Sequence, residues 1–166
     1  MGSSLSLQSD CSNCAALCCV TFEFEVSDDF AISKPAETAC PNLDECGQCK
    51  VHDELTERGF RGCAVYECHG AGQRVTQELF GGRSWQQDPT LLQPMSRSFR
   101  QVRRLHELLM LLETAGTLPL SLGDDAARVA LVKSVDALVI KMPAEQEIDE
   151  AVARVHAFLQ SLKGYA

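Results

Sequence analysis

The sequence MSRSFRQVRRLHELLMLL (residues 95–112) repeats its apolar side chains every three to four positions. This period is typical of an amphipathic α-helix with one buried face. The segment therefore predicts a long helix whose arginines lie mostly off the buried face. The inward residues would be Phe99, Val102, Leu105, Leu108, Leu109 and Leu112.

Two more helices are predicted towards the C-terminus. Asp124 and Asp125 can cap a helix that ends near Met142, because Pro143 follows, and residues 145–162 form the next. Three amphipathic helices with short connections predict a helical bundle. The predicted inward residues are Val129, Leu131, Val132, Val135, Leu138 and Val139 in the first, and Ile148, Val152, Val155, Phe158, Leu159 and Leu162 in the second.

Arginines form a ridge on the helix predicted for residues 95–112. Arg97, Arg100 and Arg104 follow i, i+3, i+7 spacing, and Arg103 lies beside them. A basic ridge is usually a solvated face, and an acidic half is available in the same chain. We expect these arginines to pair within the chain or at an interface. Trp85 is expected to anchor the packing between the two halves.

The N-terminal part carries all the cysteine. The nine cysteines form Cys11-x2-Cys14-x3-Cys18-Cys19, Cys40, Cys46-x2-Cys49 and Cys63-x4-Cys68, and residues 69–166 contain none. We therefore divide the chain into a cysteine half (1–83) and a helical half (84–166), which together can form one domain. The predicted fold class is mainly α: a loop-rich N-terminal cysteine metal module with little β structure, packed on a C-terminal helical bundle.

The cysteine half gives few signals of regular structure. Residues 21–26 (TFEFEV) alternate as in a short strand, and residues 52–58 (HDELTER) predict a two-turn helix stopped by Gly59. Cys49 would lie just before that helix, whose dipole would lower the pKa of the thiol. Residues 73–80 predict another short helix, and the glycines around it match neither a phosphate loop nor a dinucleotide fingerprint.

Charge is divided as unevenly as cysteine. Residues 1–70 carry 12 Asp and Glu against 4 Lys and Arg, whereas residues 71–166 carry 11 of each. An acidic field around thiolates favours the capture of cations and disfavours nucleic acid phosphates. Nucleic acid is therefore not an expected partner.

The sequence predicts a cytoplasmic protein. Its first residues lack the basic start and apolar run of a secretory signal, and no apolar run reaches the roughly 20 residues of a membrane span. Residues 1–6 (MGSSLS) fit the short N-myristoylation pattern, which also matches by chance. In a reducing cytosol, closely spaced cysteines are more often metal ligands than disulfides, although disulfides are the alternative.

Thiolates at these spacings predict a metal site. Soft, anionic sulfur suits zinc or iron–sulfur clusters and disfavours calcium or magnesium. The pair Cys11-x2-Cys14 makes one half-site, with Cys18 or Cys19 as a third ligand, and later cysteines make the other. Eight thiolates could hold one site or two. Cys46, between Glu45 and Gly47 in a predicted exposed turn, ranks last as a ligand.

The histidines are weaker candidates. His52 and His69 lie beside Cys49 and Cys68, where they could bind metal or hydrogen-bond to a sulfur, but an exposed loop position is the commoner role. His106 and His156 belong to the helical pattern. For these two we expect packing or surface roles.

The cysteine pattern resembles a family. Together with Arg58-Gly59-Phe60-Arg61-Gly62-Cys63 and Gly70-Ala71-Gly72-Gln73, it is similar to the bacterial CxxCxxxCC proteins described as zinc- or iron-chelating domains. It most resembles the cysteine-rich segment attached to some pentapeptide-repeat proteins, although this chain has no such repeats. The resemblance covers roughly residues 11–110 and implies eight metal ligands: Cys11, Cys14, Cys18, Cys19, Cys40, Cys49, Cys63 and Cys68.

The expected function is metal binding, with iron, most readily as an iron–sulfur cluster, or zinc as the cofactor and with a redox or sensing role. The wider group includes flagellin lysine methylases, but this chain has no recognisable methyl-donor motif. One alternative is a zinc-stabilised adaptor that binds a protein partner through its helical half. Another is an enzyme that uses the cluster or a reactive thiol.

Overall fold

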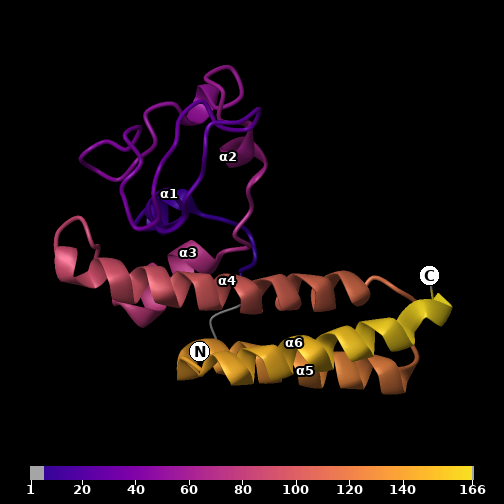
Figure 1. Ribbon diagram of the computed structural model, residues 1–166. Coiled ribbons are helices and arrows are strands. Elements are labelled where there is room, and N and C mark those ends of the chain that lie inside the picture. The colour runs from indigo at the N-terminus through magenta and orange to yellow at the C-terminus, as the bar shows by residue number, and fades with distance from the viewer. Residues whose placement is uncertain (1–5, 166) are drawn as a thin grey trace.

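Helix α4 (Leu92–Ala115) is the element on which the rest of the protein packs. In this computed structural model, which describes residues 6–165, α4 lies between the cysteine half and the hairpin of α5 and α6 (Figure 1). The prediction of a mainly α fold is confirmed. The first five residues of the acylation pattern, 1–5, lie outside the described residues, so the pattern stays a prediction.

The long helix predicted for residues 95–112 is confirmed and begins three residues earlier, at Leu92. All six residues predicted to face inward are buried. Phe99, Leu105 and Leu109 are among the largest fully buried side chains. The apolar stripe of α4 thus contributes to the core along the whole helix.

Helices α5 (Leu122–Lys141) and α6 (Glu145–Ser161) match the other two predicted helices. Asp124 is not the cap: Ser121 holds that position, and its hydroxyl accepts a hydrogen bond from the Asp124 N–H at 3.1 Å. Pro143 follows the end of α5 as predicted. Full burial is restricted to Val135 and Val139 on α5, so the apolar surface of α5 is only partly covered.

The cysteine half contains only short helices. They are α1 (Leu17–Thr21), α2 (Arg61–Val65) and α3 (Ala71–Arg74), which continues as a π-helical turn over Val75–Leu79. 3₁₀ turns lie at Cys11–Asn13 and His52–Glu54, and another, Pro89–Leu91, precedes α4 in the helical half. The helix predicted for residues 73–80 is therefore confirmed with shifted bounds.

The strand predicted for residues 21–26 is wrong. Phe24 forms a single bridge with Lys34, and residues 6–165 contain no longer ladder. Phe24 stacks on Phe30, whose ring centroid lies 4.4 Å away, and Val26 is exposed, so no continuous face is buried. An alternating pattern without a partner strand does not make a sheet.

The two-turn helix predicted for residues 52–58 is also wrong. The structure has one 3₁₀ turn followed by irregular turns. Gly59 ends the segment as predicted, with φ at +80°, and a Cβ there would lie 2.9 Å from the Ala31 Cβ. This polar segment has no apolar face to pack, and propensity alone does not sustain so short a helix.

The two halves share one hydrophobic core. Ala15, Leu17, Ala71 and Val75 of the cysteine half belong to the same buried cluster as the inner face of α4. Trp85 is the anchor that the sequence predicts, because its Nε1–H donates to the Ala15 carbonyl at 2.7 Å. The division of the chain at residues 83 and 84 stays a prediction.

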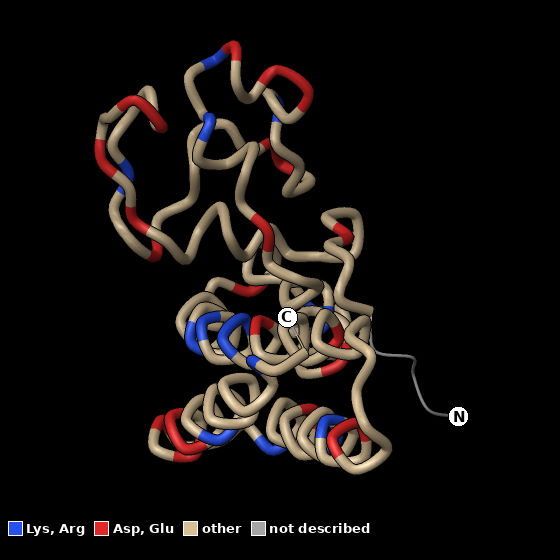
Figure 2. Tube along the Cα trace, turned by 90° about the vertical axis from the view of Figure 1, so that its right-hand side faces the viewer, with Lys and Arg blue, Asp and Glu red and all other residues tan. Residues whose placement is uncertain are grey.

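Arg100, Arg103 and Arg104 of the ridge pair within the chain, whereas Arg97 has no ion pair among the described residues. Arg104 contacts Glu145 at 2.7 Å and Asp149 at 2.6 Å on α6, and Arg100 contacts Glu37 at 3.2 Å in the cysteine half. Figure 2 shows basic residues gathered on one stretch of α4 and acidic residues spread along the loops of the cysteine half. The ridge thus links α4 to both of its neighbours.

A buried polar network crosses the junction of the halves. Arg74, 8% exposed, forms ion pairs with Glu78 at 3.2 Å and with Asp136 of α5 at 2.7 Å. Its Nη1 also lies 3.2 Å from Nε2 of the fully buried His106, whose Nδ1 lies 2.6 Å from the His69 carbonyl. A neutral His106 satisfies both contacts by donating through Nδ1 and accepting at Nε2.

We expect His106 to make the fold sensitive to acid. Burial lowers the pKa of His106 to about 4, below its usual 6.5, and the nearby Arg74 acts in the same direction against the opposing effects of Asp136 and the His69 carbonyl. Since the unfolded state binds the proton first, this contribution to stability is complete above pH 6.5 and is lost as the pH falls towards 4. Each pH unit in that window should cost up to about 1.4 kcal/mol.

Urea unfolding between pH 7 and 4 measures this loss. The variant His106→Gln should show a flatter pH dependence than the parent, whereas His156→Gln, at an exposed position, should follow the parent. Equal slopes for all three proteins would contradict the role given to His106.

Candidate metal centre

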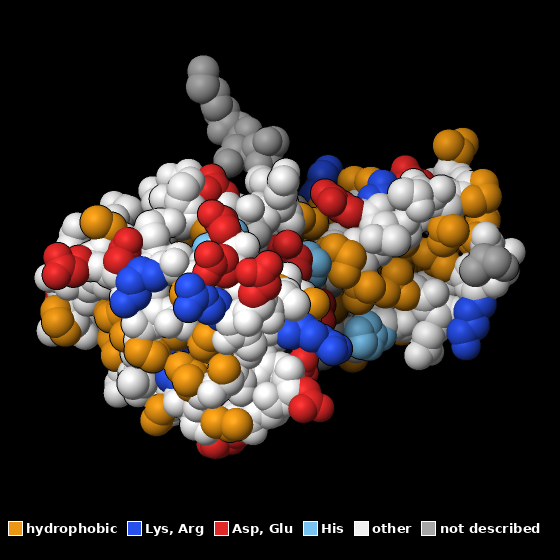
Figure 3. All heavy atoms as spheres, turned by 90° about the horizontal axis from the view of Figure 1, so that it is seen from above, with side chains coloured by type: hydrophobic (Ala, Val, Ile, Leu, Met, Phe, Trp, Pro, Cys, Tyr) orange, Lys and Arg blue, Asp and Glu red, His pale blue; other side chains and the backbone are white. Residues whose placement is uncertain are grey.

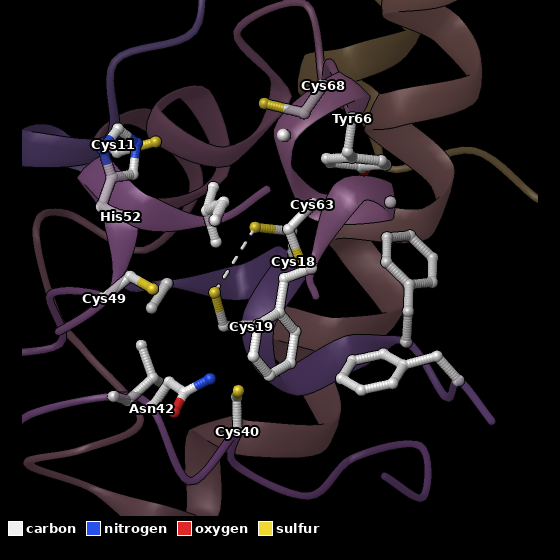
Figure 4. A pocket seen from close by; sticks show the side chains of 18 of the residues that line it. Cys11, Cys18, Cys19, Cys40, Asn42, Cys49, His52, Cys63, Tyr66 and Cys68 are labelled. Atoms are coloured by element: carbon white, nitrogen blue, oxygen red, sulfur yellow. Dashed lines mark hydrogen bonds between the residues drawn. The ribbon is translucent and has the colours of Figure 1, made fainter. Parts of the chain in front are cut away.

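Eight of the nine cysteines line one cavity in the cysteine half. The cavity has a volume of about 890 Å³, and we call it the cysteine cavity. Its cysteines are Cys11, Cys14, Cys18, Cys19, Cys40, Cys49, Cys63 and Cys68, and Figure 4 shows seven of these by label. Cys46 is exposed and does not line the cavity. The eight lining cysteines are those that the family resemblance implies.

Backbone contacts bring these distant residues together. The Cys40 N–H donates to the Cys19 carbonyl at 3.1 Å, and Leu43 forms a β-bridge with Cys49. At the other end, Ser9 Oγ lies 3.0 Å from Cys68 Sγ. The cavity is thus formed mainly by loops that hydrogen bonds hold together, rather than by a sheet or a helical bundle.

Gly72 allows a close approach to one of the thiols. A Cβ at this position would lie 2.6 Å from Cys14 Sγ and 3.8 Å from Phe99 Cε2. Only a residue without a side chain leaves room there for the sulfur. The position of Cys14 therefore depends on Gly72 of α3.

All nine cysteines are free thiols in the structure. Burial raises the pKa of Cys14 and of Cys63 to about 11, and burial also raises the pKa of Cys11, Cys40 and Cys49. The lowering of the Cys49 pKa predicted from a helix dipole is therefore wrong: three residues of 3₁₀ turn replace the expected helix, and burial dominates.

Cys18 and Cys19 differ from each other. Their Sγ atoms lie 3.8 Å apart, and this contact raises the pKa of Cys18 and lowers that of Cys19. Burial adds to the first shift, and the positive charge of Lys34 adds to the second. Cys19 is thus the thiol that deprotonates first in this pair.

Lys34 places a buried positive charge next to the thiols. Its side chain is 2% exposed, and its Nζ donates to the carbonyls of Pro35 and Thr38 at 2.9 Å each. It also lies 5.4 Å from the ring centroid of Phe24. The charges of Cys40, Cys19, Cys18 and Cys63 act on the pKa of Lys34 against the lowering that burial causes. This cation can offset part of the negative charge of a thiolate cluster.

Aromatic side chains form the apolar part of the cavity wall. Phe22, Phe24, Phe30, Phe60 and Tyr66 all line the cavity. The Tyr66 hydroxyl is buried and has no hydrogen-bond partner among the described residues. Burial raises the pKa of Tyr66 far above its usual range, so it is a neutral donor beside the sulfurs. Figure 3 looks down on this half and shows apolar and acidic side chains side by side on its surface.

The histidines occupy different places. His52 lines the cysteine cavity and, with Cys11, a second hollow beside it, so it lies within reach of the thiols. His69 does not line the cavity, and its backbone carbonyl accepts a hydrogen bond from His106 Nδ1. His106 has the packing role expected of it, and His156 is exposed on α6.

Within residues 6–165, no group of three or more His, Cys, Asp or Glu side chains converges closely enough to hold a metal ion. The sulfurs share a cavity but stand apart across it. Binding of a metal through this cavity would therefore require the loops to draw sulfurs together. Among the same residues, no helix has the length and apolar character needed to cross a membrane.

Sequence reasoning missed three residues that shape the cavity: Tyr66, which lines it, and Lys34 and Gly72, which lie behind its cysteines. Lys34 is a single lysine in an acidic segment, and the sequence does not reveal its burial. Tyr66 and Gly72 lie within the quoted family pattern, which could have drawn attention to them.

No protein-family model matches the chain, and no solved structure matches it. Over 109 residues the chain is 43% identical to the uncharacterized protein YybG of Bacillus subtilis (strain 168). The match covers 66% of this chain and 39% of that protein, so the chain spans about two fifths of the length of its relative.

Proposed function

We propose that this protein binds iron, as an iron–sulfur cluster, or zinc through the cysteine cavity, and that it acts in a reducing compartment such as the cytoplasm. The observation that carries the proposal is the gathering of eight free cysteines from separate segments around one cavity, with Cys46 outside it. A packing role alone would not need so many thiols on one hollow surface.

The donor set favours these metals over others. Thiolates bind zinc and the iron of iron–sulfur clusters, whereas calcium and magnesium prefer oxygen. A zinc ion, bound by thiolates at about 2.3 Å, needs little space. The size of the cavity, about 890 Å³, and its aromatic wall favour the larger cluster. A cluster would supply one-electron redox chemistry, which suits a redox or sensing role.

The residues of the cavity have separable tasks in this proposal. The eight thiols are the ligand candidates, and the positive charge of Lys34 offsets part of the negative charge of their thiolates. Phe22 and its aromatic neighbours limit the access of water. The buried hydroxyl of Tyr66 is available as a hydrogen-bond donor to sulfur, an interaction that tunes metal centres.

Anaerobic purification, metal analysis and an absorption spectrum test the proposal. We expect iron and sulfide with visible charge-transfer absorption, and we expect Cys18→Ser to contain less of both than the parent while Cys46→Ser keeps them. If the purified protein is colourless and contains zinc, the bound metal is zinc and not an iron–sulfur cluster. A protein that takes up neither metal, even after reconstitution with iron and sulfide, would overturn the proposal.

Gly72→Ala should weaken metal binding through Cys14. The added methyl group would lie 2.6 Å from Cys14 Sγ, so the sulfur must move. We expect the affinity for Zn²⁺, measured by competition with a chelator, to fall about tenfold or more, which corresponds to about 1.4 kcal/mol. Gly164→Ala is the matched control, because no atom lies within 4 Å of its Cβ position. Equal affinities for the two variants would show that Cys14 is not held in place by Gly72.

A second candidate is an enzyme that uses Cys19 as a reactive thiol. It is favoured by the 3.8 Å contact with Cys18, which, with Lys34, lowers the pKa of Cys19. Alkylation of the metal-free protein at neutral pH, followed by mass spectrometry, tests it. Cys19 should react faster than Cys14 and Cys63, whose thiols have raised pKa values.

A further inference from the structure

The adjacent cysteines Cys18 and Cys19 direct their sulfurs to different parts of the cysteine cavity. Both lie on α1 (Leu17–Thr21), where successive side chains leave the axis about 100° apart. The two sulfurs are 3.8 Å apart, but the two side chains point in different directions from the helix axis. Each therefore has its own set of neighbours.

The first set gathers around α3 and the segment that precedes it. The backbone N–H of Asp10 donates to Gln73 Oε1 at 3.0 Å, and Ser9 Oγ lies 3.0 Å from Cys68 Sγ. These contacts hold the turn that carries Cys11 and Cys14 against residues 68–73. Cys14, which also touches Gly72, precedes Cys18 by four residues. Cys11, Cys14, Cys18 and Cys68 are thus brought to one end of the cavity.

The second set gathers around residues 40–50. The hydrogen bond from the Cys40 N–H to the Cys19 carbonyl, at 3.1 Å, joins these two residues. The bridge between Leu43 and Cys49 and the hydrogen bond from the Lys50 N–H to the Asn42 carbonyl, at 2.8 Å, place Cys49 beside them.

Cys63 belongs with the second set. The first set already has four cysteines, so Cys63, which lies between the two ends of the cavity, completes the second set. In Figure 4, Cys11 and Cys68 lie towards one end of the cavity, Cys40 and Cys49 towards the other, and Cys18, Cys19 and Cys63 between them.

We propose that the cysteine cavity holds two four-thiolate centres, one formed by Cys11, Cys14, Cys18 and Cys68 and the other by Cys19, Cys40, Cys49 and Cys63, with the peptide unit between Cys18 and Cys19 joining them. This assignment deepens the proposed function and rests on it. It uses all eight cavity thiols once and leaves Cys46 free.

The two ends of the cavity differ in their surroundings. Lys34 lies near the second set, because its Nζ donates to the carbonyls of Pro35 and Thr38 in the segment that leads to Cys40. A divalent ion bound by four thiolates carries two net negative charges, and a fixed cation offsets one of them. The first set instead lies beside the neutral Tyr66, whose pKa responds to Cys18, Cys68 and Cys14.

Titration of the full metal-free chain with Co²⁺ under anaerobic, reducing conditions tests this division. Each ion that is bound by four thiols releases four protons and forms four cobalt–sulfur bonds, with no change in oxidation state. We expect the tetrahedral thiolate spectrum to saturate at two equivalents. A thiol reagent should then find one reactive cysteine of the nine, and mass spectrometry should identify it as Cys46.

Single variants assign the two centres. Cys68→Ser and Cys40→Ser should each bind one equivalent less than the parent and keep the other, and Cys46→Ser should bind two. The titration of the parent needs no variant, so the test survives if a variant fails to fold.

Different failures have different meanings. Saturation of the parent at one equivalent, with both variants abolishing it, would overturn the division but leave metal binding intact. If the parent takes up neither Co²⁺ nor iron and sulfide, the proposed function itself fails. Two equivalents that both disappear in either variant would indicate a single binuclear centre and would also overturn the division.

Discussion

Removal of the metal is expected to unfold residues 11–68 while α4, α5 and α6 keep their helical structure. Within the cysteine half the helices α1, α2 and α3 have five residues or fewer, and loops joined by single bridges make up most of the rest. Such a segment buries little apolar surface of its own. In small metal-dependent domains the bound ion contributes about 10–16 kcal/mol near neutral pH, which is folding free energy.

Hydrogen exchange measured by mass spectrometry, with and without a chelator, tests this expectation. Amides of residues 11–68 should exchange about a hundredfold faster or more after chelation, and those of α4 should change little. The chelator applied to protein that was purified without metal is the control. Equal protection with and without metal would mean that the cysteine half folds by packing alone.

Phe99→Ala is expected to lower the free energy of unfolding by about 3–5 kcal/mol, as is usual for a phenylalanine lost from a core. Phe99 is 1% exposed, and its ring centroid lies 5.7 Å from that of Phe22 in the cysteine half. It also faces the Gly72 position of α3. The substitution would therefore leave a cavity at the contact between the two halves, which lowers the stability of the folded state.

Urea unfolding of the metal-saturated protein, followed by far-ultraviolet circular dichroism, gives this difference. Ile140→Ala is the matched control, because Ile140 is 57% exposed on α5 and should change stability by less than about 0.5 kcal/mol. A loss below about 1 kcal/mol for Phe99→Ala would show that the halves do not depend on this contact.

The helical half was predictable because its pattern repeats over several turns. In α4 the period of 3.6 identifies both the helix and its buried residues, and Pro143 limits α5. The cap at Ser121 was missed because Asp124 and Asp125 are good caps as well, and only the chain path decides between them. Local preference is enough where one regular element buries one face.

The cysteine half was less predictable because its structure depends on distant contacts. Residues 21–26 and 52–58 follow strand and helix patterns, but neither has a partner that would stabilise the regular form. The neighbours Glu45 and Gly47, which indicate an exposed turn, and the family resemblance separated Cys46 from the eight cysteines that line the cavity. The burial of Lys34 could not be predicted, because its ammonium group is surrounded by the carbonyls of Val20 in α1 and of Pro35 and Thr38 in a loop.

The order in which the chain acquires its structure follows from the position of α4. Helices α4, α5 and α6 are joined by short turns, so their contacts are local in sequence and form fast, in microseconds to milliseconds for helical proteins. Formation of the cysteine cavity requires contacts between residues much farther apart in sequence, because the cysteines that line it extend from Cys11 to Cys68. After synthesis of the chain, we expect α4 to fold and pack against α5 and α6 before the cysteine cavity forms. The rate of maturation would then be set by the supply of metal rather than by the helices.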